Sequence, residues 1–221
     1  QILQSNNYDH VVDLQNNLRS LKIRTALKVN NHVYFKSNFK RHLLINFGVD
    51  LLKNHVVDRY FNTIKKLNVV NDNKGIDYFI NGSPNVEFNT KQEYIIWCIG
   101  GTHEHKKLSC TQITEVISKL NMPILLIGGP EDKKIGSEIM KKANSDHVYN
   151  FCGKTSLTEL IAILFKSKLL VGNDSGSMHL MSALRKPQIA IFGSTSPKWT
   201  SPINPYSSVI TKNFSCSPCF A

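Results

Sequence analysis

The feature that most constrains the fold is a strand–turn–helix–strand pattern in residues 169–202. The apolar run Leu169–Val171 leads into a polar turn, Gly172–Gly176, and a helical pattern covers Ser177–Arg185. A proline ends that helix, and the second apolar run, Ile189–Phe192, follows directly. Two strands joined through a helix lie parallel in one sheet, so this segment predicts a βαβ unit.

The turn of this unit carries the chemistry. Asp174 and Ser175 are favoured residue types at a helix start, and Gly176 lets the backbone approach a ligand closely. Unpaired N–H groups at a helix start suit a phosphate, while Asp174 can instead accept a hydrogen bond from a sugar hydroxyl. His179 lies one turn into the helix, in reach of the same anion. An ordinary helix-capping turn is the alternative.

The same alternation precedes this unit and extends the prediction to a whole domain. Strands that alternate with helices of about ten residues indicate a parallel, doubly wound sheet, which binds ligands at the carboxyl ends of its strands. We expect strands at Tyr94–Ile99, Ile124–Ile127 and His147–Tyr149, and helices at Thr111–Leu120, Lys133–Ala143 and Leu157–Phe165.

The loop Gly100–Lys107 leaves the first of these strands. Its glycines, the hydroxyl of Thr102 and the charge of Lys106 suit a diphosphate, although a plain solvent loop is the alternative. The neighbouring His103 and His105 have loose metal-ligand spacing and no third ligand, so we predict no metal site and no cofactor.

The loop Gly128–Asp132 leaves the second strand. An acidic residue after a glycine pair can accept hydrogen bonds from ribose hydroxyls, as in dinucleotide folds. Glu131 and Asp132 are both candidates, with capping of the next helix as the alternative for each.

Five scattered cysteines argue against a disulfide framework, and Cys216-x-x-Cys219 has no second pair to complete a zinc site. The chain has 221 residues, enough for one large or two small domains. Asn71–Thr90 is rich in turn-forming residues, and we place a domain boundary there.

The N-terminal part is basic: residues 1–70 carry a formal charge of +7 out of +11 for the chain. This suits an anionic partner, namely phosphorylated lipid, an anionic membrane surface or nucleic acid, with a solvated basic face as the alternative. Within it we expect a strand at Tyr8–Leu14, then a basic helix, an irregular loop over Lys28–Leu44 and a helix at His55–Leu67.

Three motifs of the C-terminal part carry a family resemblance. D-S-G-x-M-H at Asp174–His179, A-L-x-K-P at Ala183–Pro187 and I-x-x-F-G-x-T-x-P at Ile189–Pro197 resemble the nucleotide-sugar site of bacterial ADP-heptose:lipopolysaccharide heptosyltransferases. The resemblance implies an α/β fold of the GT-B type, with two Rossmann-like, doubly wound domains and parallel sheets. Residues 1–88 would form an incomplete acceptor-side domain and residues 89–221 the donor-binding domain.

The resemblance also implies an inverting, metal-independent transfer of heptose from ADP-heptose to the lipopolysaccharide inner core. The catalytic base is expected in a first N-terminal loop that this sequence does not contain, so we assign no catalytic residue and expect a longer enzyme. We expect a cytoplasmic protein, peripheral at the inner membrane, that does not act on nucleic acid. A basic nucleic-acid or anionic-membrane binding module on an inactive glycosyltransferase fold is the alternative. The implied donor-binding residues are Thr102, Lys106, Glu131, Asp132, Asp174, Ser175, Gly176 and His179, and the implied acceptor-binding residues are Arg19, Lys22, Arg24 and Arg59. Of the two acidic residues, Asp132 matches the acidic position of the family slightly better than Glu131.

Overall fold

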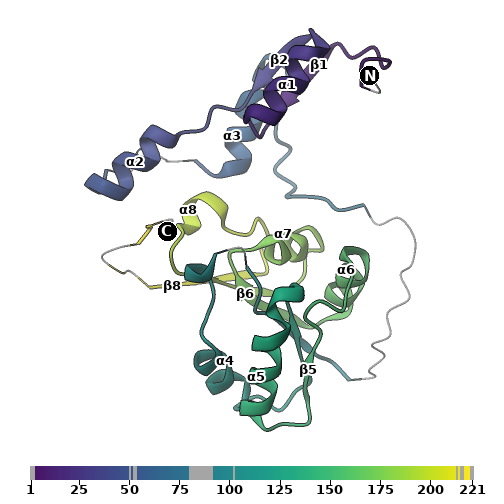
Figure 1. Ribbon diagram of the computed structural model, residues 1–221, viewed down its shortest axis with the longest axis vertical. Helices are drawn as coiled ribbons and strands as arrows, with labels where there is room; N and C mark the ends of the chain where they lie inside the picture. The colour runs from purple at the N-terminus through teal and green to yellow at the C-terminus, as the bar shows by residue number, and fades with distance from the viewer. Residues whose placement is uncertain are drawn as a thin grey trace. The chain divides into compact units, whose positions relative to one another are not determined.

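A computed structural model describes residues 3–49, 51, 54–79, 92–101, 103–212, 214 and 217–219. The chain divides into two compact units (Figure 1), one comprising Gln1–Lys74 with Lys198–Thr200, the other Gly75–Pro197 with Ser201–Ala221. The boundary predicted between residues 88 and 89 falls outside the described residues and stays a prediction.

The C-terminal unit is built on a six-stranded sheet in which every neighbouring pair is parallel, in the order β5-β4-β3-β6-β7-β8. This confirms the parallel sheet that the alternation predicted; the edge strand β8 was not foreseen. The strands are β3 (Ile95–Cys98), β4 (Ile124–Ile127), β5 (Val148–Asn150), β6 (Leu169–Asn173), β7 (Gln188–Phe192) and β8 (Ser207–Thr211).

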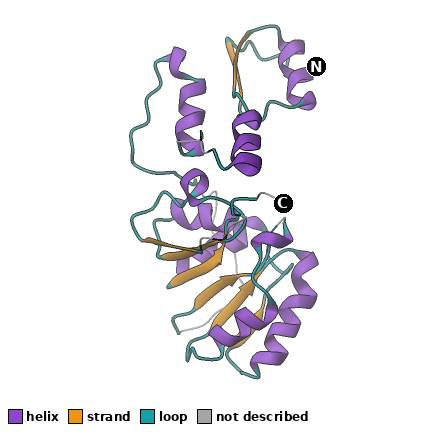
Figure 2. Ribbon diagram, turned by 90° about the vertical axis from the view of Figure 1, so that its left-hand side faces the viewer, coloured by secondary structure: helices purple, strands orange, loops and turns teal. Residues whose placement is uncertain are grey.

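Helices cover both faces of this sheet (Figure 2), and each face has its own core. Alternate side chains of a strand point to opposite faces. Trp97 therefore packs in the cluster that contains Ile113 and Ile139, whereas Ile96 packs in the cluster that contains Leu164 and Met181. Every residue of β3 and β4 is buried, as expected for strands covered on both sides. The helices of this unit are α4 (Cys110–Ile117), α5 (Lys133–Ala143), α6 (Leu157–Lys166) and α7 (Gly176–Ala183), with 3-10 turns η2 (Glu104–Lys106) and η3 (Pro130–Asp132). The short helix α8 (Pro197–Thr200) begins at the last residue before Lys198–Thr200, which belong to the N-terminal unit.

The N-terminal unit contains a two-stranded parallel sheet, β1 (His10–Asp13) with β2 (Asn30–Val33), joined by α1 (Leu18–Leu27). The predicted strand at Tyr8–Leu14 and the basic helix after it are confirmed. The helix predicted at His55–Leu67 is present as α3 (Val56–Thr63) and the 3-10 turn η1 (Lys65–Leu67).

The prediction of an irregular loop over Lys28–Leu44 is wrong. That range holds β2 and most of α2 (Asn38–Phe47). Backbone pairing with β1 stabilises β2. Helix α2 ends at Gly48, whose left-handed backbone (φ 68°) closes the helix on the carbonyls of Leu43 and Leu44.

Among the described residues, no helix combines the length and the apolar composition that crossing a bilayer requires.

Candidate functional site

The loops that follow β3, β4 and β6 line one cleft of about 860 Å³ in the C-terminal unit. These strands are neighbours in the sheet, in the order β4-β3-β6, so their carboxyl ends meet at one edge. The predicted residues Lys106, Glu131, Asp132, Asp174, Ser175 and Gly176 all line this cleft. Thr102, predicted to bind there too, lies outside the described residues.

Glycines allow the loops after β3 and β4 to lie close to the side chain of Asp132. A Cβ atom at Gly128 would lie 2.7 Å from both Cβ and Oδ2 of Asp132, and one at Gly100 would lie 2.7 Å from the same Oδ2. Such distances are too short for carbon, so glycine is required where Asp132 folds back over its own loop.

Asp132 is engaged inside this loop. Its Oδ2 accepts a hydrogen bond from the N–H of Gly129 at 2.8 Å, and its Oδ1 accepts one from Lys107 Nζ at 3.2 Å. The hydrogen bond of Lys107 to Glu104 raises the pKa of Lys107, and Asp132 adds to this against the lowering effect of burial. The exposed carboxylate of Glu131 also lines the cleft. The two predicted acidic residues thus differ: Asp132 stabilises the loop, and Glu131 is exposed to solvent.

Lys106 and Asp174 meet across the cleft from η2 and the end of β6. Lys106 Nζ donates to Asp174 Oδ2 at 2.7 Å and lies 3.4 Å from the backbone oxygen of the same residue. Thr195 Oγ1 donates to the same Oδ2 at 2.8 Å. Both Asp174 and Thr195 are buried. Sequence reasoning named Lys106 and Asp174 separately and did not foresee that they form an ion pair.

The start of α7 opens onto the cleft. Ser175 occupies the N-cap position, but its side chain makes no capping hydrogen bond. Gly176, the first helical residue, is exposed, and a side chain there would meet nothing within 4 Å. Uncapped N–H groups of this kind suit an anion. His179 is half-buried and is not among the residues that line the cleft, so its role in binding stays a prediction.

Sequence reasoning missed Cys98, the last residue of β3, which is one of the residues that line the cleft. Its thiol donates to Ser177 Oγ at 3.4 Å. Burial raises the pKa of the Cys98 thiol, and the nearby serine hydroxyls only partly offset this. The signal that could have found it is positional, because a strand's carboxyl end is where such a sheet binds ligands.

The four predicted acceptor residues lie in the N-terminal unit, and the structure does not bring them together. Arg19 and Lys22 are exposed on α1. Arg24 contacts Asp13, with Nη1 3.7 Å from Oδ2, and Asn16, with Nη2 3.5 Å from Oδ1.

Arg59 lies elsewhere in that unit, in a pocket of about 580 Å³ that Arg19, Lys22 and Arg24 do not line. Its guanidinium carbon is 5.8 Å from the ring centre of Tyr34, and Lys40 lines the same pocket.

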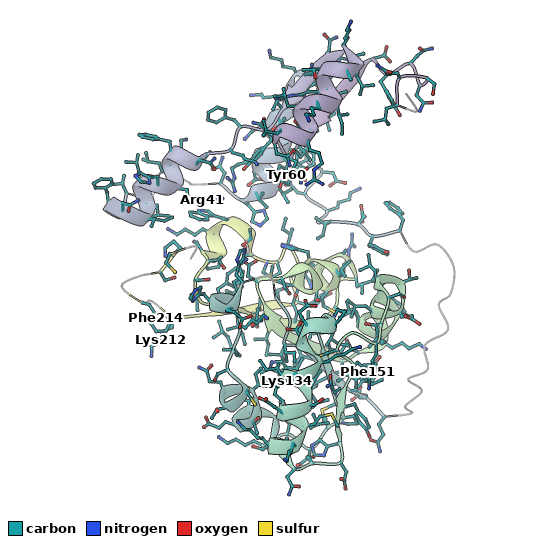
Figure 3. The ribbon with its side chains drawn as sticks, in the orientation of Figure 1. Arg41, Tyr60, Lys134, Phe151, Lys212 and Phe214 are labelled. Carbon is teal, nitrogen blue, oxygen red and sulfur yellow. The ribbon has the colours of Figure 1, made fainter. Side chains whose placement is uncertain are left out.

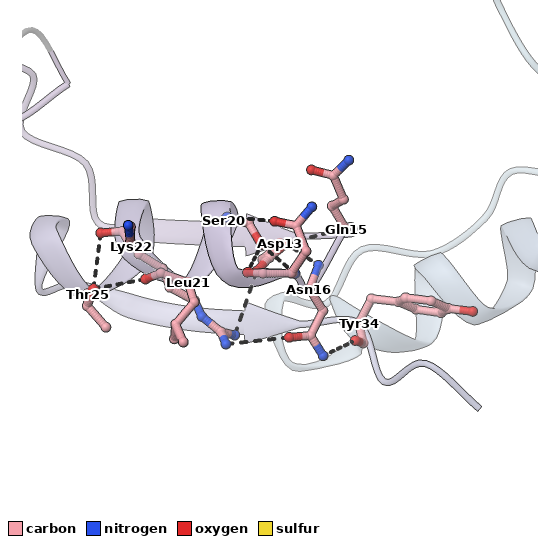
Figure 4. A network of polar contacts seen from close by, with 10 residues as sticks. Asp13, Gln15, Asn16, Ser20, Leu21, Lys22, Thr25 and Tyr34 are labelled. Carbon is pink, nitrogen blue, oxygen red and sulfur yellow. Dashed lines mark hydrogen bonds and ion pairs between the residues drawn. The ribbon is translucent and has the colours of Figure 1, made fainter. Parts of the chain in front are cut away.

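Asp13 organises the turn after β1. Its Oδ1 accepts hydrogen bonds from the N–H groups of Gln15 at 3.0 Å and Asn16 at 2.7 Å (Figure 4). Burial alone would raise the pKa of Asp13, but these hydrogen bonds, the hydroxyl of Ser20 and the charge of Arg24 together lower it. Asn17 caps α1.

Within the part of the chain that the structure describes, no three His, Cys, Asp or Glu side chains are grouped as metal ligands. Cys216, the first residue of the Cys-x-x-Cys motif, is not among the described residues.

In the comparison with protein families, residues 1–221, the whole chain, match the model of glycosyltransferase family 9 (heptosyltransferase). The chain is 32% identical over 103 residues to lipooligosaccharide heptosyltransferase 2 of Haemophilus influenzae, covering 45% of this chain and 30% of that protein. It is 27% identical over 217 residues to lipopolysaccharide heptosyltransferase 1 of Campylobacter coli, covering 87% of this chain and 63% of that protein. The chain thus spans less than two thirds of the length of these relatives.

The fold is similar to a solved structure, that of E. coli ADP-heptose lipopolysaccharide heptosyltransferase II. The TM-score is 0.73 at 19% identity, over 98% of this chain and 72% of that one. This similarity confirms the α/β fold with parallel sheets that the sequence resemblance led us to expect.

Proposed function

The chain belongs to glycosyltransferase family 9, and on that premise we propose that it takes part in transferring a heptose from ADP-heptose to the inner core of lipopolysaccharide. The observation that carries the proposal is the cleft at the carboxyl edge of the sheet. Three loops, two lysines and an uncapped helix start converge there, as a nucleotide diphosphate requires. Residues 89–221 would hold the donor, and residues 1–88 would face the acceptor.

The donor-binding residues predicted from the sequence take the following roles in this proposal. The N–H groups at Ser175 and Gly176 and the ammonium of Lys106 bind the diphosphate, with the Thr102 hydroxyl as a further donor. Glu131 accepts hydrogen bonds from the ribose, because its carboxylate is exposed while that of Asp132 holds the loop. Asp174 accepts hydrogen bonds from the hydroxyls of the transferred sugar.

We propose an inverting mechanism. An acceptor hydroxyl attacks the anomeric carbon on the face opposite to the diphosphate, the new C–O bond forms as the bond to ADP breaks, and the hydroxyl proton passes to a general base. The base must lie within hydrogen-bond reach of that hydroxyl, and we assign it to no residue here. Lys106 and the start of α7 stabilise the charge that develops on ADP, so the proposed reaction needs no divalent metal.

For the acceptor we favour the pocket around Arg59. A guanidinium can form two hydrogen bonds with a phosphate or carboxylate, and Lys40 adds a second positive charge in the same pocket. Among the described residues, none accepts a hydrogen bond from the buried Nε atom of Arg59, which leaves a donor for a ligand. Arg19 and Lys22 can contact further anionic groups, whereas Arg24 is already paired with Asp13.

We also propose that the protein contacts the cytoplasmic face of an anionic inner membrane through α2. Residues 14–49 carry seven lysines and arginines and no acidic residue. Side chains project from α2 along its length, Arg41 among them (Figure 3), and Phe39 and Phe47 are 73% and 69% exposed. Exposed aromatic side chains beside basic ones are typical of helices that lie in a lipid interface.

Vesicle co-sedimentation tests this contact. The wild-type chain should sediment with phosphatidylglycerol vesicles and much less with phosphatidylcholine vesicles. The pair Phe39→Ser and Phe47→Ser should weaken binding at least fivefold, whereas Phe165→Ser, an exposed aromatic of α6, should not. Equal binding by both variants would refute the assignment of α2.

Calorimetry with ADP-heptose, UDP-glucose and GDP-mannose tests the donor site. We expect binding of ADP-heptose alone, and at least tenfold weaker binding by Lys106→Met, because a charge paired to the diphosphate is lost. Lys141→Met, which removes an exposed lysine of α5, is the matched control. Salt-sensitive RNA binding without affinity for any nucleotide sugar would overturn the proposal and favour a nucleic-acid binding module.

A further inference from the structure

The ion pair between Lys106 and Asp174 spans the cleft in which the donor is proposed to bind. Oδ2 of Asp174 receives both the ammonium of Lys106 and the hydroxyl of Thr195, at 2.7 and 2.8 Å. Within the described part of the chain, these contacts to the carboxylate are all made through Oδ2, which leaves Oδ1 able to accept from a ligand. The group that should attract a phosphate is therefore already bound to a buried carboxylate.

The charged residues that line the cleft increase this competition between Asp174 and a phosphate for Lys106. The chain as a whole carries +11, but the residues that line the cleft include four carboxylates (Glu104, Glu131, Asp132 and Asp174) and two lysines. Lys107 is held by Glu104 and Asp132, at 2.8 and 3.2 Å. A nucleotide diphosphate therefore finds no unpaired lysine among the described lining residues and must draw Lys106 away from Asp174.

That exchange has an unequal cost for different ligands. A buried carboxylate that loses its ionic partner is strongly unfavourable unless new hydrogen-bond donors replace that partner. Bare ADP takes Lys106 and offers Asp174 nothing in return. A nucleotide sugar takes Lys106 and presents sugar hydroxyls, which donate to the same carboxylate.

We propose that Asp174 is a specificity-determining residue that makes the site prefer the sugar-linked nucleotide over the free nucleotide product. This inference rests on the proposed function, since it assumes that the cleft binds a nucleotide diphosphate sugar. Its consequence for turnover is that loss of the sugar returns Lys106 to Asp174, which favours release of ADP.

Calorimetry with ADP and with ADP-heptose on the wild-type chain and Asp174→Asn tests the idea. Asp174→Asn should bind ADP about tenfold more tightly, equivalent to about 1.4 kcal/mol, because Lys106 is released in advance. The preference for ADP-heptose over ADP should fall at least tenfold. Asp146→Asn, which removes one negative charge at an exposed position of the same unit, should change neither value.

A double-mutant cycle separates the ion pair from general repulsion. In a Lys106→Met background, Asp174→Asn should alter the affinity for ADP less than threefold. An equal tightening with and without Lys106 would overturn the proposal, and so would unchanged or weaker ADP binding by Asp174→Asn itself.

Thr195→Val gives an independent readout that keeps the carboxylate. It removes the second donor to Asp174 Oδ2, so the carboxylate depends more on Lys106, and ADP should bind several-fold more weakly. Tighter or unchanged binding by this variant would count against the inference. Failure of the wild-type chain to bind either ligand would instead refute the proposed function.

Discussion

The two units of this chain are held together by different means. In the C-terminal unit β3 and β4 are entirely buried, and the helices α4 to α7 all contribute buried residues. In the N-terminal unit α1, α2 and α3 have no buried residue, and among the described residues before Gly75 only Asp13 and Tyr34 are buried. The C-terminal unit depends on apolar packing, whereas the N-terminal unit depends more on hydrogen bonds, helix caps and a few ion pairs.

The units also differ in charge. Residues 1–70 carry +7 of the total of +11, which leaves +4 for the longer remainder. A closely packed unit can hold binding residues in a fixed geometry, whereas a basic unit attracts an anionic surface. The proposed donor site lies in the closely packed unit, and the proposed contact with an anionic surface lies in the basic unit.

The largest expected effect is on the free energy of unfolding, and it tests the difference in apolar packing between the two units. Leu164→Ala, at a fully buried position of α6, should lower the free energy of unfolding by about 3 kcal/mol through lost contacts and a new cavity. Leu18→Ala, at a position of α1 that is 80% exposed, should cost less than about 0.5 kcal/mol. Urea denaturation followed by circular dichroism measures both, and comparable losses would break the comparison.

A second pair of variants compares the loops. Gly128→Ala would place its Cβ 2.7 Å from Asp132, so the loop must shift; we expect a loss of about 2 kcal/mol and weaker nucleotide binding. At Gly48 a side chain meets nothing within 4 Å, and only the left-handed backbone is strained, so Gly48→Ala should cost about 1 kcal/mol. Thermal unfolding ranks the two, and a larger loss at Gly48 would show that backbone strain outweighs close packing.

Helix caps give a smaller difference. Ser156 accepts a hydrogen bond from the N–H of Glu159 in a capping box of α6, so Ser156→Ala should cost about 1 kcal/mol. Ser37 stands at the N-cap of α2 without such a bond, so Ser37→Ala should be close to neutral. The measurement is again unfolding in urea; equal costs would mean that Ser37 caps α2 in solution.

The smallest effect concerns pH. The pKa of Asp13 is lower in the folded chain than its ordinary value of 3.8, so its ionised form stabilises the fold. This stabilisation is present above pH 3.8 and is lost as the pH falls through the lower folded value. Asp13→Asn should cost about 0.5 kcal/mol at neutral pH. Melting temperatures of both proteins from pH 7 to pH 2.5 should converge only at the acidic end, and a constant difference would refute the role of the charge.

The sequence predicted the C-terminal sheet well because strands covered on both faces are written as continuous apolar runs, such as Ile124–Ile127. It failed for β2, whose residues Asn30–Val33 are largely exposed and are held by backbone pairing with β1. It also failed for α2, because Phe39, Ile45 and Phe47 face solvent and give no stripe that packs on a neighbour.

The candidate site shows the same limit. Motifs and the position of loops after strands identified the lining residues, since those follow from chain order. The pairing of Lys106 with Asp174, 68 residues apart, depends on which strands are neighbours, and the engagement of Asp132 depends on how one turn folds back. Neither can be read from spacing, so the resemblance gave Asp132 only a slight preference over Glu131.

The strand order has a mechanical consequence. From β3 the sheet grows outwards through β4 to β5, and the chain then crosses to β6 and grows in the opposite direction through β7 to β8. The cleft lies over that seam, with Gly100 on one side and Asp174 on the other. A ligand bound there contacts both halves of the sheet and links them. Ligand binding should therefore slow amide hydrogen exchange in β4 and in β7 alike.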